Sequence, residues 1–295
     1  MRFLDAGAVA ALGPAAAVRA VTDALLAGFD PADDPARLNV GLAQGHFLLM
    51  PSESATATGV KIATVAPGNA TRGLPRIQAV YLLFDRDTLA LRAALDGTAL
   101  TTLRTPAVSV AAVLPHLPDR PLRVAVVGSG PQARGHVATL AAVRPLDDVV
   151  HLVRDPARTD LRAERLGTPA SDEVVRSADV IVCATSARTP ILDSELVRDD
   201  AVVIAVGSHE PDARELEPAL LARSTVAVED VGAALREAGD VVLAIAEGAI
   251  TAGGLVPMRA VVTGGVVPPD DRPLVFKGVG MSWQDLVVAE AVVGR

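Results

Sequence analysis

Residues 122–133 read LRVAVVGSGPQA, and this segment constrains the fold more than any other part of the chain. The run from Leu122 to Val127 is mostly apolar without a regular alternation, which is typical of a strand buried on both faces of a parallel sheet. A glycine-rich turn follows at once, and a helix is expected over 132–143. This order of strand, turn and helix predicts a βαβ unit that binds a dinucleotide.

The residues of the turn suit contact with a pyrophosphate. Gly128 permits the tight turn, Gly130 lets the backbone approach the phosphates, and Ala133 allows close contact between helix and strand. The helix N-terminus supplies N–H donors and the positive end of the helix dipole. Such a turn can also be purely structural, but this context favours a nicotinamide dinucleotide. The candidate cofactor-binding residues here are Gly128, Ser129, Gly130, Pro131, Gln132 and Ala133.

The end of the next strand, predicted over 149–154, bears on the choice between NAD and NADP. An NAD site usually places an acidic residue about 20 residues beyond the turn, where it binds the ribose 2′-hydroxyl. If Val153 holds that position, Arg154 can pair with the 2′-phosphate of NADP; if Asp155 holds it, NAD is favoured. We predict a preference for NADP, and a solvated strand-end charge is the alternative role of Arg154.

Strands and helices continue to alternate beyond this unit, which predicts an α/β fold with a parallel sheet. Further strands are expected over 179–185, 201–207 and 225–230. After about residue 270 the rhythm changes to a strand, a glycine-rich turn and a closing helix.

The chain before residue 120 follows another pattern. It predicts a helix over 14–28, a loop over 29–36, strands over 46–51, 58–66 and 77–85, and a helix over 98–117. Pro106 should lie near the first turn of the last helix, because proline lacks the N–H that a helix interior uses.

Composition limits the classes of function. At about 150 residues per domain, the 295 residues favour two domains. The 27 Lys and Arg residues against 35 Asp and Glu residues give a net charge of −8, which argues against nucleic-acid binding. Aromatic residues make up only 2% of the chain, which disfavours base stacking and favours a compact aliphatic substrate. The position of Trp283, the lone tryptophan, tests this expectation.

Cys183 is the only cysteine, which excludes an internal disulfide and a Cys-rich zinc site. The histidines lack metal-ligand spacing, so no metal is expected. No stretch of about 18 residues is free of charges and breakers, and the first residues lack a signal-peptide core. We therefore expect a cytoplasmic protein without a membrane segment. The acidic pairs Asp33-Asp34 and Asp199-Asp200 are expected in solvated loops.

Several short blocks appear in a characteristic order. They are MP at 50–51, GVK at 59–61, PGN at 67–69, GLP at 73–75, LTTLRT at 100–105, the glycine turn, VGSHEPDARE at 206–215 and FKGVGMSWQDL at 276–286. In order and spacing they resemble the ornithine cyclodeaminase/mu-crystallin family over nearly the whole chain.

The resemblance implies a NAD(P)-binding Rossmann domain over 120–270 and a second, α+β domain formed by 1–119 and 271–295. It implies a homodimer formed through the second domain, and a substrate held between the two domains against the nicotinamide. It also implies cofactor contacts at Thr185, Ser186 and Val206.

Arg37, Lys61 and Arg104 match the family's carboxylate-binding and catalytic positions. Since a strand alternates its faces, Lys61 shares one side with Ala63. An isolated strand lysine is usually a surface residue, and only the joint match favours a site. A partly desolvated lysine beside two arginines should have a lowered pKa, which makes proton exchange near neutral pH feasible.

The chain departs from the cyclodeaminase pattern at two acid/base positions. Leu48 stands where those members carry an acid, and His209 stands where they carry an aspartate. These departures disfavour ornithine cyclisation, and the blocks at 208–212 and 276–281 resemble those of mu-crystallin and its ketimine-reducing relatives. His209 could serve as a replacement acid or base, or as a hydrogen-bonding residue at a strand end.

The resulting prediction is an NAD(P)H-dependent oxidoreductase that reduces a small cyclic imino acid or interconverts an amino acid and its imine. One alternative is an ornithine cyclodeaminase, against which Leu48 and His209 count. The other is a non-catalytic NADP-dependent binder of a small molecule, against which the retained Lys61 and both arginines count.

Overall fold

The computed structural model describes residues 2–294. The chain divides into two compact units: unit 1 comprises Met1–Val108 and Met281–Arg295, and unit 2 comprises Ser109–Gly280. Each unit is built around its own sheet.

Unit 1 contains a six-stranded sheet in the order β1-β6-β5-β4-β3-β2. The short strand β1 (Arg2–Leu4) pairs parallel with β6 (Leu91–Asp96), and the remaining pairs are antiparallel. The other strands are β2 (Leu38–Leu42), β3 (Gly45–Glu53), β4 (Ala57–Val65) and β5 (Ile77–Asp85). Strands β3 and β5 contain predicted runs, and β4 contains all but the last residue of its predicted run.

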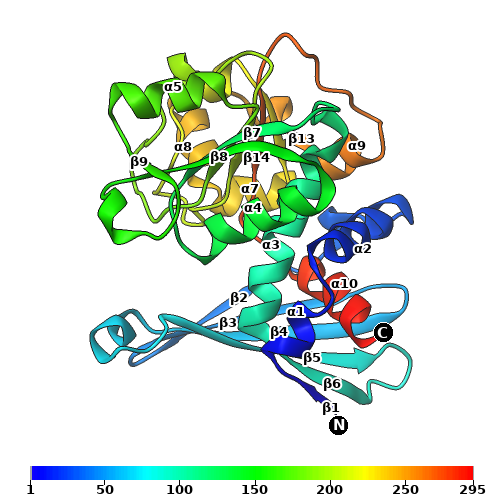
Figure 1. Ribbon diagram of the computed structural model, residues 1–295. Coiled ribbons are helices and arrows are strands. Elements are labelled where there is room, and N and C mark those ends of the chain that lie inside the picture. The colour runs from blue at the N-terminus through cyan, green and yellow to red at the C-terminus, as the bar shows by residue number, and fades with distance from the viewer. Residues whose placement is uncertain (1, 295) are drawn as a thin grey trace. The chain divides into compact units, whose positions relative to one another are not determined.

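One face of this sheet is buried by helices. Along β4, burial alternates, and Ala57, Gly59, Lys61 and Ala63 form the buried face. The closing helix α10 (Ser282–Val293) packs on β3, β4 and β5, and α2 (Pro14–Leu26) packs on α10. Figure 1 shows both helices on the same side of the sheet, with the short helix α1 (Ala6–Ala10) nearby. Pro14 begins α2 as predicted, because a first-turn proline costs no hydrogen bond.

The expected position of Pro106 is wrong. Helix α3 (Gly97–Val113) begins where Asp96 caps the N–H groups of Thr98 and Ala99, which leaves Pro106 in the helix interior. The neighbouring Ala107 and Val108 are buried, and this burial offsets the backbone hydrogen bond that proline removes.

Unit 2 contains an eight-stranded sheet in the order β13-β12-β14-β11-β10-β7-β8-β9, with parallel pairing throughout. The predicted α/β fold class is confirmed. The strands are β7 (Leu122–Val127), β8 (Leu146–Val153), β9 (Ala163–Arg165), β10 (Val180–Cys183), β11 (Val202–Ala205), β12 (Thr225–Val228), β13 (Val256–Pro257) and β14 (Leu274–Lys277). The helices are α4 (Pro131–Val143), α5 (Pro169–Ser177), α6 (Pro218–Ala222), α7 (Val231–Glu237), α8 (Gly239–Ala246) and α9 (Met258–Val262).

The expected boundaries between the two parts need correction. Strand β14 lies between β11 and β12, so residues 271–280 belong with unit 2 rather than with the closing helix. The other division falls within α3, not at residue 119. The sequence did not indicate that β14 belongs to the parallel sheet. No helix lies between α9 and β14, so the alternation of strand and helix is broken there.

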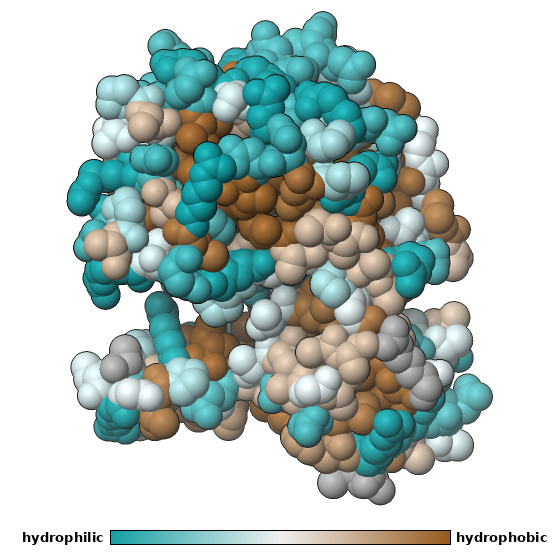
Figure 2. Space-filling model, viewed as in Figure 1, coloured by the Kyte–Doolittle hydropathy of each residue, from teal (hydrophilic) through white to brown (hydrophobic). Residues whose placement is uncertain are grey.

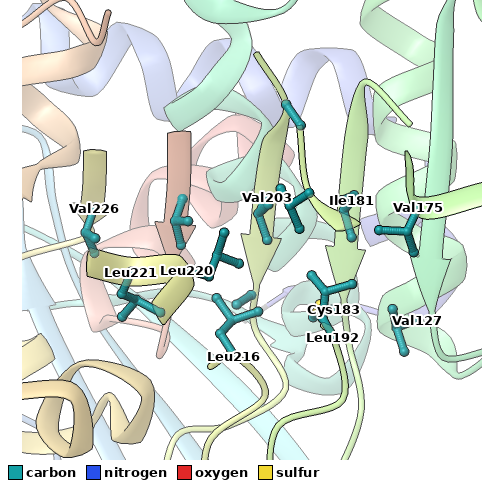
Figure 3. Close-up of a cluster of buried hydrophobic side chains, with 14 of the residues drawn as sticks. Val127, Val175, Ile181, Cys183, Leu192, Val203, Leu216, Leu220, Leu221 and Val226 are labelled. Atoms are coloured by element: carbon teal, nitrogen blue, oxygen red, sulfur yellow. The ribbon is translucent and has the colours of Figure 1, made fainter. Parts of the chain in front are cut away.

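The centre of unit 2 is an aliphatic core. Figure 3 shows Ile181 and Cys183 of β10 and Val203 of β11 among side chains contributed by the flanking segments. Cys183 is a buried free thiol whose pKa is raised by burial, as expected of an inert cysteine. Polar side chains, teal in Figure 2, cover much of the visible surface of this unit. The buried parallel strands fix the positions of the loops at their carboxyl ends.

Candidate active site

Lys61 lies in the middle of β4, between Met50 on β3 and Tyr81 on β5. Its side chain is only 4% exposed, so it is not a surface lysine. The ammonium group donates to Asp285 Oδ2 at 2.7 Å and to Thr101 Oγ1 at 3.4 Å.

Asp285, which the sequence reasoning did not single out, joins two of the predicted cations. It lies on α10 and is fully buried, with Arg104 Nε 3.3 Å from its Oδ1. The neighbouring Gln284 accepts a hydrogen bond from Arg104 Nη1 at 2.6 Å. The available signal was an acidic residue directly before the apolar run Leu286–Ala289 of α10, because a buried carboxylate requires a partner.

The pKa of Lys61 is lowered to about 8, as the sequence led us to expect. Burial is the main cause, because the protein interior disfavours the charged amine. Asp285 opposes this shift, whereas Arg104 and Arg37 add to it by repulsion. The amine therefore remains mostly protonated at neutral pH and can release its proton.

Arg37 precedes strand β2 and is half-buried. Its effect on the pKa of Lys61 places its charge near the same site. Leu48 lies opposite Ala63, on the face that Lys61 shares, so an apolar residue stands beside the lysine. Unit 1 thus carries all three predicted cations.

The expectation that Asp34 lies in a solvated loop is wrong. Its carboxylate accepts hydrogen bonds from Ser52 Oγ at 2.6 Å and from the backbone N–H of Trp283 at 2.9 Å. Burial raises the pKa of Asp34 to about 6. The Asp- and Pro-rich composition suggested solvent exposure, since the partner at the start of α10 is far away in the sequence.

Trp283 is fully buried and contributes no exposed aromatic surface to a binding site. Its ring lies 5.3 Å from that of Phe29, between centroids, in a tilted arrangement. The tryptophan therefore packs the start of α10 against the segment that follows α2.

The glycine turn of unit 2 fits a dinucleotide. Gly128 has a φ of +119°, and an added Cβ would lie 2.7 Å from the carbonyl oxygen of Ala184. A Cβ at Gly130 would meet no atom within 4 Å, so the backbone is open at the N-terminus of α4. Pro131 is in the first turn of α4, and Ala133 is fully buried against the sheet, which are the features that a pyrophosphate-binding turn requires.

The flanking residues of the turn are anchored locally. Ser129 and Gln132 are half-buried, and the backbone carbonyl of Ser129 accepts a hydrogen bond from Arg134 Nε at 3.3 Å. His151 of β8 lies 2.8 Å, through Nδ1, from the carbonyl oxygen of Gly128.

At the end of β8, Arg154 is exposed. The neighbouring Asp155 accepts a hydrogen bond from the backbone N–H of Ala157 at 3.2 Å and thereby caps a short helical turn over Pro156–Arg158. One carboxylate oxygen of Asp155 is thus engaged in a local turn, while the Arg154 side chain is exposed to solvent.

Thr185 and Val206 follow the ends of β10 and β11 and are half-buried, and Ser186 is exposed. A buried carboxylate that the sequence did not reveal, Glu215, links these loops. It accepts hydrogen bonds from the N–H and hydroxyl of Thr185 at 2.8 and 2.7 Å and from the N–H of Gly207 at 2.7 Å.

His209 is exposed in the loop after β11 and belongs to unit 2, whereas the three cations belong to unit 1. Among residues 2–294, no cluster of His, Cys, Asp or Glu side chains could hold a metal ion. None of the helices in that range is long and apolar enough to cross a membrane.

Comparison with known proteins places the chain in one family. The profile of the ornithine cyclodeaminase/mu-crystallin family matches residues 14–295. The Delta(1)-pyrroline-2-carboxylate reductase of Bacillus cereus is 33% identical over 267 residues, covering 85% of this chain and 82% of that protein. The ketimine reductase mu-crystallin of Mus musculus is 33% identical over 288 residues, covering 92% of this chain and 89% of that protein.

A solved structure agrees with this assignment. Delta(1)-pyrroline-2-carboxylate reductase from Thermococcus litoralis, in complex with NADH and L-proline, has a TM-score of 0.89 and 25% identity, covering 100% of this chain and 97% of that one. The chain therefore belongs to the ornithine cyclodeaminase/mu-crystallin family.

Proposed function

We propose that the protein is an NAD(P)H-dependent reductase of small cyclic imino acids such as pyrroline- and piperideine-carboxylates. The observation that carries this proposal is the buried Lys61, ion-paired with Asp285 and accompanied by Arg104 and Arg37. The glycine turn supports a nicotinamide dinucleotide, and the relatives named above reduce or bind related compounds.

The cations suit a substrate carboxylate. A guanidinium offers paired donors that match a planar carboxylate, and we assign this role to Arg37 and Arg104. The other positions that share the face of Lys61 include Leu48, Ala63 and Ala79, which are paired across three strands. These apolar side chains favour a compact aliphatic ring over a charged side chain.

Lys61 is proposed as the catalytic acid. When bound, NAD(P)H supplies a hydride to the C=N carbon. The imine nitrogen gains a proton, which Lys61 donates directly or through an ordered water, so that a C=N bond becomes CH–NH. The Lys61 ammonium suits this task because its pKa of about 8 keeps the proton present at neutral pH and transferable.

The proposed cofactor contacts belong to unit 2. They are Gly128, Ser129, Gly130, Pro131, Gln132, Ala133, Arg154, Thr185, Ser186 and Val206. We propose NADP as the preferred form, because Asp155 is engaged in its own turn and Arg154 is exposed beside it. His209 of unit 2 is a second candidate acid or base.

The decisive experiment is a screen of NADPH consumption with pyrroline-2-carboxylate and piperideine-2-carboxylate, with NADH in parallel. Stoichiometric oxidation of the cofactor with formation of the cyclic amino acid is expected. Ammonia release from L-ornithine without net NADH formation would instead establish a cyclodeaminase. Tight cofactor binding without turnover of any imine or amino acid would establish a non-catalytic binder.

We further propose a homodimer. Five apolar side chains occupy paired positions on the face of the sheet opposite to that of Lys61: Leu38, Val40, Phe47, Leu49 and Ile62. Leu38 and Val40, on the edge strand β2, are 57% and 45% exposed. Adjacent exposed apolar side chains on a sheet face commonly mark an interface.

A cytoplasmic location is proposed on chemical grounds. A reductase that consumes NAD(P)H needs a compartment that regenerates this cofactor, and the sole cysteine is a free thiol. Fractionation of the native cells tests this location.

A further inference from the structure

We propose that Asp285 is a positioning residue. It orients the Lys61 ammonium and the Arg104 guanidinium toward the substrate site and keeps Lys61 in its acid form. This proposal rests on the proposed function only for the identity of the group that Lys61 protonates. The proposal is based on two buried contacts that the Asp285 carboxylate makes, one with Lys61 and one with Arg104.

The contacts of Lys61 fix the direction of its remaining proton. One N–H points to Asp285 Oδ2 at 2.7 Å, and a second points to Thr101 Oγ1 at 3.4 Å. The Thr101 hydroxyl itself donates to the carbonyl oxygen of Gly97 at 2.8 Å, so it can only accept from the lysine. Among residues 2–294, the third N–H of Lys61 has no protein acceptor, which leaves it for a substrate.

The same turn of α10 holds Arg104. Gln284 Oε1 accepts from Nη1 at 2.6 Å, while Asp285 Oδ1 lies 3.3 Å from Nε. Gln284 and Asp285 are both fully buried. Two consecutive side chains of the closing helix therefore orient both the proposed proton donor and a proposed carboxylate-binding group.

The charges around Lys61 make Asp285 necessary. Burial and the two neighbouring arginines, Arg37 and Arg104, all favour the neutral amine, and Asp285 is the group that favours the ammonium form. Burial is the main cause of the raised pKa of both Asp34 and Tyr81, and the charge of Asp285 adds to each shift, so both groups also lie near this carboxylate. The Asp34 carboxylate is engaged by Ser52 and Trp283, and Lys61 donates only to Asp285 and Thr101 among residues 2–294, so the contact with Asp285 has no substitute there.

Hydrogen bonds hold helix α10 in place on both sides of Asp285. Asp34 accepts from the N–H of Trp283 near its start. Near its end, Glu290 accepts from Thr56 Oγ1 at 2.6 Å and from Ser54 Oγ at 3.0 Å, in the turn between β3 and β4. The position of Asp285 relative to β4 is thus set by contacts independent of Lys61.

The lysine content of the chain makes a direct test practical. Only two of the 27 Lys and Arg residues are lysines, Lys61 and Lys277. Lys277 is fully buried and paired with Asp240 at 2.9 Å in unit 2. Protein carrying ¹³C-labelled lysine side chains therefore gives two Cε signals, and the Lys61→Met variant assigns them.

The test compares Asp285→Asn with Asp87→Asn, a control that removes an exposed carboxylate of unit 1. In the asparagine variant the NMR titration midpoint of Lys61 should fall by about 1–3 pH units, and the basic limb of the kcat profile should fall with it. In the control, both the midpoint and kcat should stay at wild-type values. An unchanged Lys61 midpoint in Asp285→Asn would overturn the charge role of Asp285.

A second variant separates charge from position and remains informative if Asp285→Asn does not fold. Asp285→Glu keeps the charge but displaces the ammonium, so the Lys61 midpoint should stay close to wild type while kcat falls about tenfold or more. Wild-type kcat in this variant would overturn the positioning role. If the wild-type protein reduces no imine, the proposed function fails, yet the Lys61 midpoints still decide the effect of Asp285.

Discussion

At the scale of single residues, the important fact is that Lys61 stays protonated in a buried environment that disfavours a charged amine. The side chain of Lys61 is 4% exposed and two arginines repel it, yet the carboxylate of Asp285 holds its pKa at about 8 rather than lower. A fully solvated lysine would hold its proton too firmly at neutral pH, and an unpaired buried one would lose it. The geometry thus suits this amine to the proposed proton transfer.

The Lys61→Met substitution should remove most of the turnover while NADPH still binds. Loss of a positioned acid typically costs about 10²–10⁴-fold in rate, and methionine fills a similar volume without a proton. Steady-state kinetics with pyrroline-2-carboxylate measures the first effect, and fluorescence titration with NADPH measures the second. Turnover at the wild-type level would remove Lys61 from the mechanism.

Arg154→Ala should raise the Kd for NADPH about tenfold to a hundredfold and leave that for NADH nearly unchanged. The expected loss is that of a charge-assisted hydrogen bond, about 1.5–3 kcal/mol, and only NADPH carries the 2′-phosphate. Arg176→Ala, which removes an exposed arginine of α5, is the matched control. Equal losses for both cofactors would show that Arg154 does not select between them.

At the scale of elements, helix α10 carries residues from the far end of the chain into the site of unit 1. The alternating strand β4 predicted that Lys61 and Ala63 share a face, but no local pattern indicated which helix covers that face. The partners of Lys61 and Asp34 on α10 lie more than two hundred positions away in the sequence. Local periodicity reveals elements, whereas such pairings are decided by tertiary packing.

The burial of Asp34 beside the start of α10 should give stability a specific pH dependence, because burial raises the pKa of this carboxyl more than its hydrogen bonds lower it. Because the pKa of Asp34 rises from 3.8 to about 6 on folding, the folded state binds this proton more readily than the unfolded state. The stabilisation is therefore fully present below about pH 4 and is lost as the pH rises through about 6. Asp34→Asn removes this titration.

Urea unfolding of wild type and Asp34→Asn at pH 4.5 and pH 7 tests this prediction. The unfolding free energy of wild type relative to the variant should be lower at pH 7 than at pH 4.5, by about 1–3 kcal/mol. Comparing the two proteins at each pH cancels the titration of their shared groups. A difference that does not change between the two pH values would contradict the raised pKa of Asp34.

At the scale of the whole molecule, the glycine turn and the order of strands were enough to predict the α/β class, because a buried parallel strand and its turn have strong local signatures. The boundaries were less predictable. Strand β14 joins the sheet of unit 2 from beyond the last regular helix, and Pro106 remains inside α3 because the surrounding burial offsets its missing donor. The three cations of the site came from the family resemblance, whereas Asp285 emerged only from packing.

The exposed apolar face of the six-stranded sheet predicts that the assembly depends on β2. Val40→Lys places a charge at a position that is 45% exposed in the single chain, so it should leave the fold of one chain intact. If a second copy covers this face, burying an unpaired lysine there would cost several kcal/mol and shift the dimer toward monomer. Light scattering coupled to size-exclusion chromatography measures this shift, and Arg176→Ala again serves as the control. A wild-type protein that is monomeric at micromolar concentration would refute the dimer, and a variant that remains dimeric would place its interface elsewhere.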